Sequence, residues 1–250
     1  MTKIFDEYKS FAKKYDLGRK ISDINAKERQ FYSQLFTEHG VRTVLDCACG
    51  TGRHCYLFSK MGYDVQGSDI SAAMLAQACA NFKEADIHVT LTQCDFRELE
   101  KYFIQKFDAV VCLTTSLPHL HEDNDLVKAL VSMKAVLTDR GIVVVDQGTT
   151  HSSLKPERRF ELVVDNKDFS RVFVKEIKDR LQTIHILDIS HGIPETRLEH
   201  HKVTYRILLD TDYERLFSQA GYQQTQIVGD WDRSPYEPAT SKRLIVIGKK

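Results

Sequence analysis

The sequence has little that interrupts a chain, with 5 prolines and 12 glycines in 250 residues and no tract rich in proline, glycine or serine. Independent domains joined by a flexible linker are therefore not indicated. An excess of charge of one sign is also missing, because 35 Lys and Arg residues balance 35 Asp and Glu residues. Without a net positive field, we expect neither nucleic acid nor an anionic membrane surface as a partner.

Long apolar runs are missing as well. No stretch approaches the roughly 20 apolar residues that cross a bilayer, and residues 1–10 lack the hydrophobic segment of a signal peptide. The six cysteines all lie in the first half of the chain, mostly in apolar surroundings. This distribution favours reduced thiols in a core over a disulfide framework, so we expect a cytoplasmic protein.

Short apolar runs alternate with helix-length segments in the first part of the chain. The runs that predict strands are residues 41–46, 64–68, 87–91, 107–113 and 141–146. Between them, residues 71–83 and 126–137 carry apolar side chains at helical spacing. Together with final strands at 222–228 and 243–247, the pattern predicts a Rossmann-like, doubly wound α/β fold with a seven-stranded, mostly parallel sheet.

A different pattern separates these two parts of the predicted sheet. Four strand-like runs follow one another in residues 150–207, which indicates a small antiparallel β layer that forms a lid or substrate region. We therefore expect one domain over residues 1–250, with a helical cap at 1–40 and a core made of 41–149 and 208–250. Alternating residues of the inserted layer could form an interface between copies, so a homo-oligomer stays open.

The first predicted strand ends in a glycine-containing turn that leads into a helix. Gly50 and Gly52 let the backbone approach a ligand closely, and the helix start presents unpaired N–H groups to an anion. A dinucleotide fingerprint would place a third glycine at position 55, where the chain has Cys55. A carboxylate would fit this turn as well as a pyrophosphate.

Acidic residues follow the next two strands. Asp69 ends the second strand, where a carboxylate can accept hydrogen bonds from both hydroxyls of a ribose. After the third strand, Asp95 could pair with an adenine amino group while the neighbouring Phe96 covers the ring. The sequence thus predicts a nucleoside site at one edge of the sheet.

Four motifs in this order, Val44–Gly52, the Asp69 strand end, Cys94–Phe96 and Phe107–Leu113, resemble those of class I S-adenosylmethionine-dependent methyltransferases. The alternative is a related domain that binds another nucleotide. The resemblance implies S-adenosylmethionine as cofactor, S-adenosylhomocysteine as product and no metal. The cofactor-binding residues that it implies are Tyr15, Asp46, Ala48, Cys49, Gly50, Gly52, Asp69, Ile70, Met74, Cys94, Asp95, Phe96 and Leu113.

Three longer stretches resemble glycine N-methyltransferase and the sugar-amine N,N-dimethyltransferases more closely. These stretches are Glu38–Gly52, Phe107–Leu120 and Val228–Trp231 with the nearby Pro235-Tyr236. One departure is Gly148, which stands where the glycine enzyme has an arginine that clasps the substrate carboxylate. Losing such a bidentate contact makes glycine itself a doubtful substrate.

His119 is the expected catalytic residue, because it follows the fourth strand at the ligand-binding edge and resembles a proton-accepting histidine of the sugar-amine enzymes. It would contact the substrate together with Trp231 and Tyr236, although each of the three could simply pack. Arg197, Arg206 and Arg243 could bind an anionic substrate, but solvated strand positions explain them equally well.

The expected function is methyl transfer to a small-molecule acceptor, with an amine nitrogen favoured. Transfer to oxygen or carbon of another small metabolite is the first alternative, and it would need a stronger base than His119. A sensor that binds S-adenosylmethionine without turnover is the second. A macromolecular methyltransferase is the third, which a basic groove or an aromatic stacking platform would distinguish, and the neutral composition does not favour it.

Overall fold

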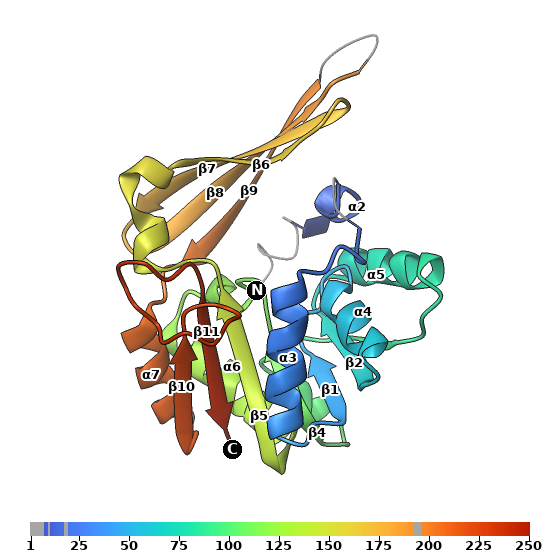
Figure 1. The fold of residues 1–250 in the computed structure, drawn as a ribbon, viewed down its shortest axis with the longest axis vertical. Coiled ribbons are helices and arrows are strands. Elements are labelled where there is room, and N and C mark those ends of the chain that lie inside the picture. The colour runs from blue at the N-terminus through green and yellow to red at the C-terminus, as the bar shows by residue number, and fades with distance from the viewer. Residues whose placement is uncertain (1–7, 10, 18–19, 193–196) are drawn as a thin grey trace.

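The computed structural model of the 250-residue chain describes residues 8–9, 11–17, 20–192 and 197–250. A seven-stranded sheet, sheet A, has the order β10-β11-β5-β4-β1-β2-β3 (Figure 1). Its strands are β1 (Thr43–Asp46), β2 (Asp64–Asp69), β3 (Thr90–Gln93), β4 (Phe107–Cys112), β5 (Leu137–Gln147), β10 (Gln224–Val228) and β11 (Leu244–Lys249). Only β11 runs against its neighbours in sheet A, so the mostly parallel sheet is confirmed.

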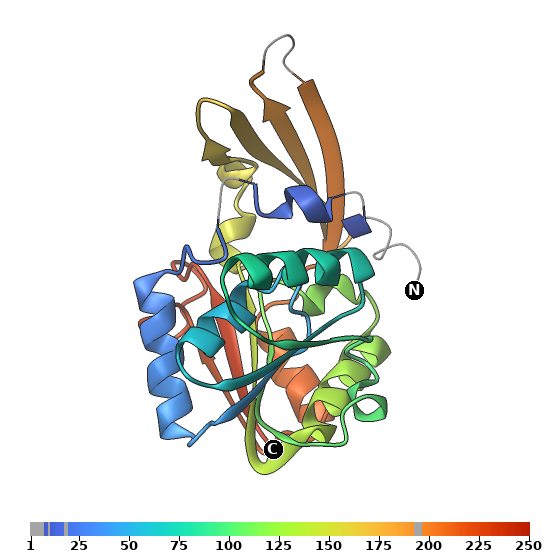
Figure 2. The ribbon, with the colours of Figure 1, turned by 90° about the vertical axis from the view of Figure 1, so that its right-hand side faces the viewer.

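Helices cover both faces of sheet A (Figures 1 and 2). One face packs against α3 (Ala26–Glu38), α4 (Arg53–Lys60) and α5 (Ala72–Glu84), and the other against α6 (Asp123–Ala135) and α7 (Asp210–Gln219). Alternate residues of β5 go to opposite cores, Val144 to the first and Val145 to the second. This burial on both sides explains why the central strands are apolar without interruption.

The helix starts follow capping rules that the sequence already displays. The Asn25 side chain accepts from the backbone of Lys27 at the start of α3, and Ser71 caps Met74 at the start of α5. Helix α3 then buries Phe31 and Leu35 completely or nearly so, as its apolar spacing predicts. Short 3-10 turns η1 (Leu99–Lys101), η2 (Leu117–His119), η3 (His151–Leu154) and η4 (Pro156–Arg158) occupy connections.

A separate antiparallel sheet, sheet B, contains β6 (Phe160–Asp165), β7 (Phe169–Lys178), β8 (Leu181–Ser190) and β9 (Arg197–Arg206). It lies beyond the carboxyl ends of the parallel strands of sheet A (Figure 1). The four inserted strands are therefore confirmed. The turn between β7 and β8 has left-handed backbone at Asp179 (φ 49°) and Arg180 (φ 62°). The sequence does not predict this conformation, because the turn contains no glycine.

Several predicted boundaries were wrong by two or three residues. The third strand was expected at 87–91 but begins at Thr90, and the helix expected at 126–137 ends at Ala135. Leu137 instead opens β5, whose first residues pair with Phe107 before the register shifts. Leucine suits a helix and a buried strand equally, so periodicity alone cannot assign this residue.

Sheet B is joined to the core through a short N-terminal segment that includes α2 (Ala12–Tyr15). On sheet B, the buried Arg171 makes two hydrogen bonds to Asp188, at 2.7 and 2.8 Å, and donates to the backbone carbonyls of Lys14 and Tyr15. On the core side, Asp16 accepts from the Thr51 hydroxyl at 2.9 Å. The segment therefore connects the inserted sheet with the glycine-containing turn.

In the described residues, no helix is both long and apolar enough to cross a membrane.

Arg171→Met should lower the free energy of unfolding by about 3 to 5 kcal/mol, because the substitution leaves the Asp188 carboxylate buried without its partner. Urea unfolding measures this change. The double variant Arg171→Met/Asp188→Leu removes both charges and should recover most of the lost stability. A single variant as stable as the wild type would contradict the role given to this pair.

Candidate functional site

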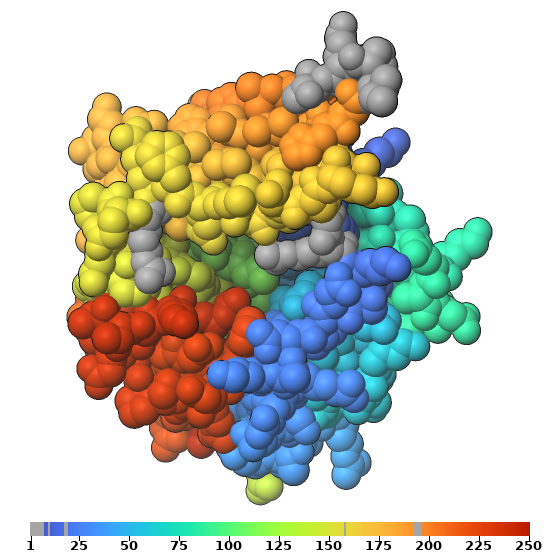
Figure 3. All heavy atoms as spheres, turned by 45° about the horizontal axis from the view of Figure 1, so that its top comes forward, coloured from blue at the N-terminus to red at the C-terminus, as the bar shows by residue number. Residues whose placement is uncertain are grey.

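The carboxyl ends of the parallel strands bring the predicted site residues together at one edge of sheet A. Asp46 and Asp69 end β1 and β2, and β4 leads through residues 113–116 into η2 with His119. Figure 3 shows a hollow here between the atoms of sheet B, in yellow and orange, and those of α3 and the C-terminal part of the chain. Green atoms from the middle of the chain lie at its base.

The turn after β1 needs glycine at two positions. Gly50 and Gly52 have φ values of 53° and 90°, which side chains with a Cβ rarely adopt. A Cβ at Gly52 would also lie 2.4 Å from Cε1 of Phe82, so the turn fits closely against α5. The turn thereby holds the start of α4 open towards the edge of the sheet, with no side-chain cap on its N–H groups.

Asp69 holds this turn from the neighbouring strand. Its Oδ2 accepts from the backbone of Gly50 at 2.9 Å, and its Oδ1 accepts from the backbone of Ser71 at 2.8 Å. Burial raises the pKa of Asp69, and the backbone hydrogen bonds act against that rise. Met74 packs beside the turn, with its Cε 3.4 Å from the position of a Cβ on Gly50.

The other predicted cofactor residues surround this centre. Ala48 and Phe96 are partly buried, while Cys49, Cys94 and Leu113 are buried. The backbone carbonyl of Ile70 accepts from the Gln93 side chain. Tyr15 is 36% exposed, and its ring contacts those of Tyr8 and Phe11.

Asp95 has a partner that sequence reasoning did not foresee. Both of its oxygens accept from Arg97, at distances between 2.6 and 3.1 Å, and Arg97 also pairs with Asp125. The carboxylate is therefore oriented from within the chain.

His119 has one occupied ring nitrogen. Its Nε2 lies 2.9 Å from the Tyr8 hydroxyl, whereas its Nδ1 is buried and has no hydrogen-bond partner among the described residues. The Tyr205 ring, from β9 of sheet B, lies against the imidazole with 4.6 Å between ring centres. Burial, with a small contribution from the charge of His121, lowers the pKa of His119 to about 4.

Tyr8 is part of the same cluster. Burial raises its pKa well above the ordinary value, and a hydrogen bond with Tyr205 adds to the rise. The cluster of His119, Tyr8 and Tyr205 thus combines the loop after β4, the N-terminal segment and sheet B. The raised pKa keeps the Tyr8 hydroxyl neutral at physiological pH.

Asp46 is 1% exposed and lies where β1 ends. Burial raises its pKa to about 6, although the charge of His54 and a hydrogen bond from the backbone of Ala48 oppose the rise. Nearby, burial alone would raise the pKa of Glu28, but hydrogen bonds from His54 and Arg53 hold it at about 2. The pocket side of α3 and α4 is thus polar as well as buried.

The two predicted substrate residues of the C-terminal part are in different surroundings. The Trp231 ring stacks against the Arg243 guanidinium at 3.8 Å. Tyr236 packs against the opposite core, and burial raises the pKa of its hydroxyl. Of these two, Trp231 is the one that shares a face of sheet A with Asp46.

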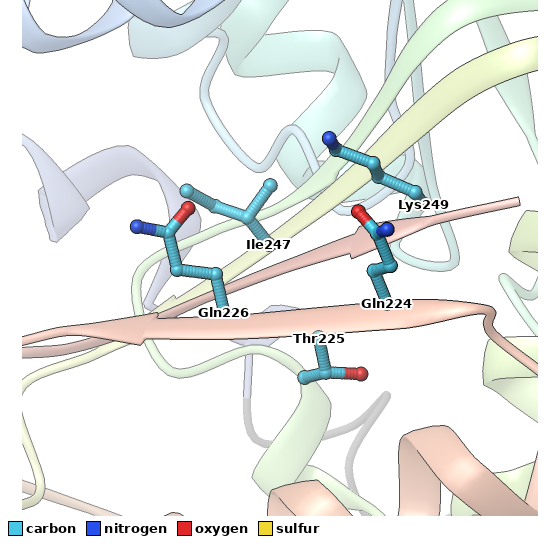
Figure 4. Close-up of a pocket in the computed structure, with 5 residues that line it drawn as sticks. All are labelled: Gln224, Thr225, Gln226, Ile247 and Lys249. Carbon is cyan, nitrogen blue, oxygen red and sulfur yellow. The ribbon is translucent and has the colours of Figure 1, made fainter.

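A separate depression on sheet A is lined by Gln224, Thr225, Gln226, Ile247 and Lys249 (Figure 4). It lies away from the carboxyl edge. Lys249 pairs with Ile142, which is five residues before Gln147, the last residue of β5. It contains no buried acid, base or nucleophile. Among the described residues, no group of three or more His, Cys, Asp or Glu is arranged to hold a metal ion.

Several residues of the site were missed from the sequence. Tyr8 and Tyr205 stand in segments without a motif, and Asp16 and Asn81 join the glycine turn only through tertiary contacts. Asp146 offered a clue, since an acid at the end of a buried strand needs partners. It accepts from the backbone of Thr114 and from Arg243, which fixes the loop before His119.

Comparison with known proteins gives the family. Residues 44–141 match a family model described as a methyltransferase domain. The chain is 40% identical over 134 residues to a glycine/sarcosine N-methyltransferase of Parasynechococcus marenigrum, a match that covers 52% of this chain and only 48% of that enzyme.

Two further similarities extend over more of the chain. It is 30% identical over 183 residues to the dTDP-3-amino-3,6-dideoxy-alpha-D-glucopyranose N,N-dimethyltransferase of Streptomyces fradiae, covering 72% of this chain and 69% of that protein. An S-adenosylmethionine-dependent methyltransferase structure from Clostridium acetobutylicum has a TM-score of 0.78 at 20% identity, covering 97% of this chain and 98% of its own. The latter likeness establishes the fold.

Asp46→Asn should stabilise the protein at pH 7.5 by roughly 3 kcal/mol, since ionised Asp46 is buried. The folded pKa of about 6 exceeds the ordinary 3.8, so the native state binds the extra proton between these values. The advantage of the variant should therefore shrink as the pH falls through 6 towards 4. Urea unfolding across this range measures it.

Asp108→Asn is the matched control, because hydrogen bonds from Arg42 and Thr43 outweigh burial and lower the pKa of Asp108. That variant should lose stability at pH 7.5. If both asparagine variants lost stability equally, the burial of the ionised Asp46 carboxylate would not cost the stability assigned to it.

Proposed function

Because the chain belongs to the class I S-adenosylmethionine-dependent methyltransferase family, we propose that it transfers a methyl group to an amine nitrogen of a small molecule. The observation that supports an amine acceptor best is the buried Nδ1 of His119, which has no hydrogen-bond partner among the described residues and lies next to the carboxyl edge of the sheet. A neutral imidazole nitrogen can accept a hydrogen from an amine without leaving an unpaired charge.

The residues at the edge fit S-adenosylmethionine, which supplies a methyl group on a positively charged sulfur when bound. Gly50 and Gly52 leave no side chain between the turn and a ligand, and the start of α4 can receive a carboxylate. Asp69, already fixed by two backbone hydrogen bonds, has further acceptor capacity for ribose hydroxyls. Around these three, the residues proposed to hold the cofactor are Tyr15, Asp46, Ala48, Cys49, Ile70, Met74, Cys94, Asp95, Phe96 and Leu113.

The hydrogen bonds of the His119 cluster favour one tautomer. We assign the ring proton to Nε2, which donates to the Tyr8 oxygen while the Tyr8 hydroxyl donates to Tyr205. This chain of donors leaves the lone pair of Nδ1 free to accept. Tyr8 and Tyr205 act as positioning residues, because they set the tautomer and the ring orientation without needing to contact the substrate.

The low pKa of His119 defines what the residue can do. With a pKa of about 4 it is neutral at pH 7, and it can accept an N–H from a neutral amine and direct the nitrogen lone pair to the methyl carbon. With S-adenosylmethionine held by the glycine turn and Asp69, transfer would form a nitrogen–carbon bond, and the electrons of the broken sulfur–carbon bond would remain on sulfur. The surplus proton of the methylated nitrogen then leaves through Nδ1 or a water to solvent.

Residues 150–207 form the lid in this proposal, within one domain that spans the whole chain. Sheet B contributes Tyr205 to the His119 cluster, so closing the lid and ordering the imidazole are the same event. The proposed location is the cytoplasm, where the six free cysteines stay reduced. The proposed partner is the small-molecule acceptor.

Release of S-adenosylhomocysteine tests the proposal. The purified protein is given S-adenosylmethionine with glycine, sarcosine, simple amines and amino sugars, and matched alcohols serve as oxygen acceptors. Release that depends on an amine supports nitrogen transfer. Release with the alcohols and not with the amines, or cofactor binding without any release, would contradict it.

His119→Ala should lower kcat by about 10²-fold while leaving the affinity for S-adenosylhomocysteine within twofold, because the imidazole contributes to positioning and proton acceptance. His119→Gln, which restores an acceptor, should recover part of the loss. The control is His121→Ala, whose exposed ring hydrogen-bonds to the backbone carbonyl of Thr204. Full turnover in His119→Ala would remove His119 from the mechanism.

A further inference from the structure

Of the three arginines that could bind an anion, only Arg243 lies at the edge that holds the site. Arg206 pairs with Asp123 and the backbone of His121, and Arg197 is exposed at the start of β9. Leu244 pairs with Gln147, the last residue of β5, so Arg243 lies across from Gly148. In Figure 1, β11 starts at the end of sheet A that faces sheet B.

The guanidinium of Arg243 is fixed in direction but incompletely paired. It stacks on Trp231 at 3.8 Å, and Nη1 donates to Asp146 Oδ2 at 2.9 Å. This is its one side-chain hydrogen bond within the described residues, although a guanidinium has five N–H donors. With 26% of its side chain exposed, Arg243 is accessible to solvent beside the carboxyl end of β5.

Other donors near the same position also lack acceptors. The Trp231 Nε1 and the Tyr32 hydroxyl are buried, and neither has a hydrogen-bond partner in the described part of the chain. Neither donates to Asp146 in the described part of the chain, where its Oδ1 accepts from the Thr114 backbone and its Oδ2 from Arg243. Unpaired buried donors are costly, so the surroundings of Arg243 favour an added acceptor.

There is also room beside the guanidinium. A Cβ built on Gly148 would meet no atom within 4 Å, so the end of β5 is open next to Arg243. The adjoining Thr114 and Thr115 have φ values of 54° and 66°, strained conformations for β-branched residues. Asp146 holds both of them, which keeps the loop that leads to His119 next to Arg243.

We propose that Arg243, supported by Trp231 and Tyr32, binds an anionic group of the methyl acceptor, either a carboxylate or a phosphate. The inference rests on the proposed amine methyl transfer and adds that the acceptor carries this anion away from its nitrogen. A stacked guanidinium that presents a fixed fork suits both oxyanions. Arg243, across from Gly148, would thereby provide the arginine contact that position 148 lacks.

Matched pairs of acceptors test the inference. Glycine is compared with glycinamide, and an amino sugar phosphate with the same amino sugar lacking phosphate, by S-adenosylhomocysteine release. The wild type should prefer the anionic member of one pair, which also identifies the anion. Arg243→Lys keeps the charge opposite Asp146 but loses the fork, and should lower kcat/KM for that acceptor at least tenfold, mainly through KM.

Arg243→Met/Asp146→Asn removes both charges together and guards against misfolding, since it leaves no carboxylate unpaired. It should abolish the preference for the anionic acceptor while the affinity for S-adenosylhomocysteine stays unchanged. Arg233→Met, at a residue that pairs with Glu38 on the surface, should keep the wild-type preference.

A preference that survives in both Arg243 variants, or a wild type that prefers the neutral acceptors, would overturn the inference and leave amine methylation standing. Weaker binding of S-adenosylhomocysteine without a change in acceptor preference would assign Arg243 to the cofactor carboxylate and also overturn it. If no amine is methylated, the proposed function itself fails, and the inference fails with it.

Discussion

The contact between the Tyr8 hydroxyl and His119 is the interaction on which the rest of the site depends. It joins residues 111 positions apart, and Tyr205 from sheet B completes the cluster. A buried imidazole with an unoccupied nitrogen is costly by itself, so it is retained only where other contacts fix the ring. Those contacts come from three segments, and the site is complete only when the N-terminal segment and sheet B both lie over the carboxyl edge.

Other groups at the carboxyl edge of the sheet are also kept in unfavourable conformations or surroundings. Asp46 is an acid kept in a buried place, and Thr114 with Thr115 keep a left-handed backbone that Asp146 stabilises. Each feature costs stability and orients a group towards the same edge. The rigid parallel sheet tolerates these costs because its two cores are continuous and closely packed.

The order of elements could be predicted because apolar periods, turn residues and caps act locally. The glycine turn and Asp69 could also be predicted. The turn follows a predicted strand directly, and Asp69 stands at the end of the next one. Tyr8 could not be predicted, because its role comes from a tertiary contact and its neighbours carry no motif. The partner of Asp95 was hidden for a related reason: Arg97 is only two positions away in sequence, but the folded turn decides which way its side chain points.

The most direct test of the central claim, a neutral His119 with an open Nδ1, is a nitrogen NMR titration of its imidazole, assigned by comparison with His119→Gln. The account predicts an Nε2-protonated, neutral ring at pH 7 that gains its second proton only near pH 4. A ring protonated at Nδ1 instead, or one that titrates near the ordinary value of 6.5, would contradict it.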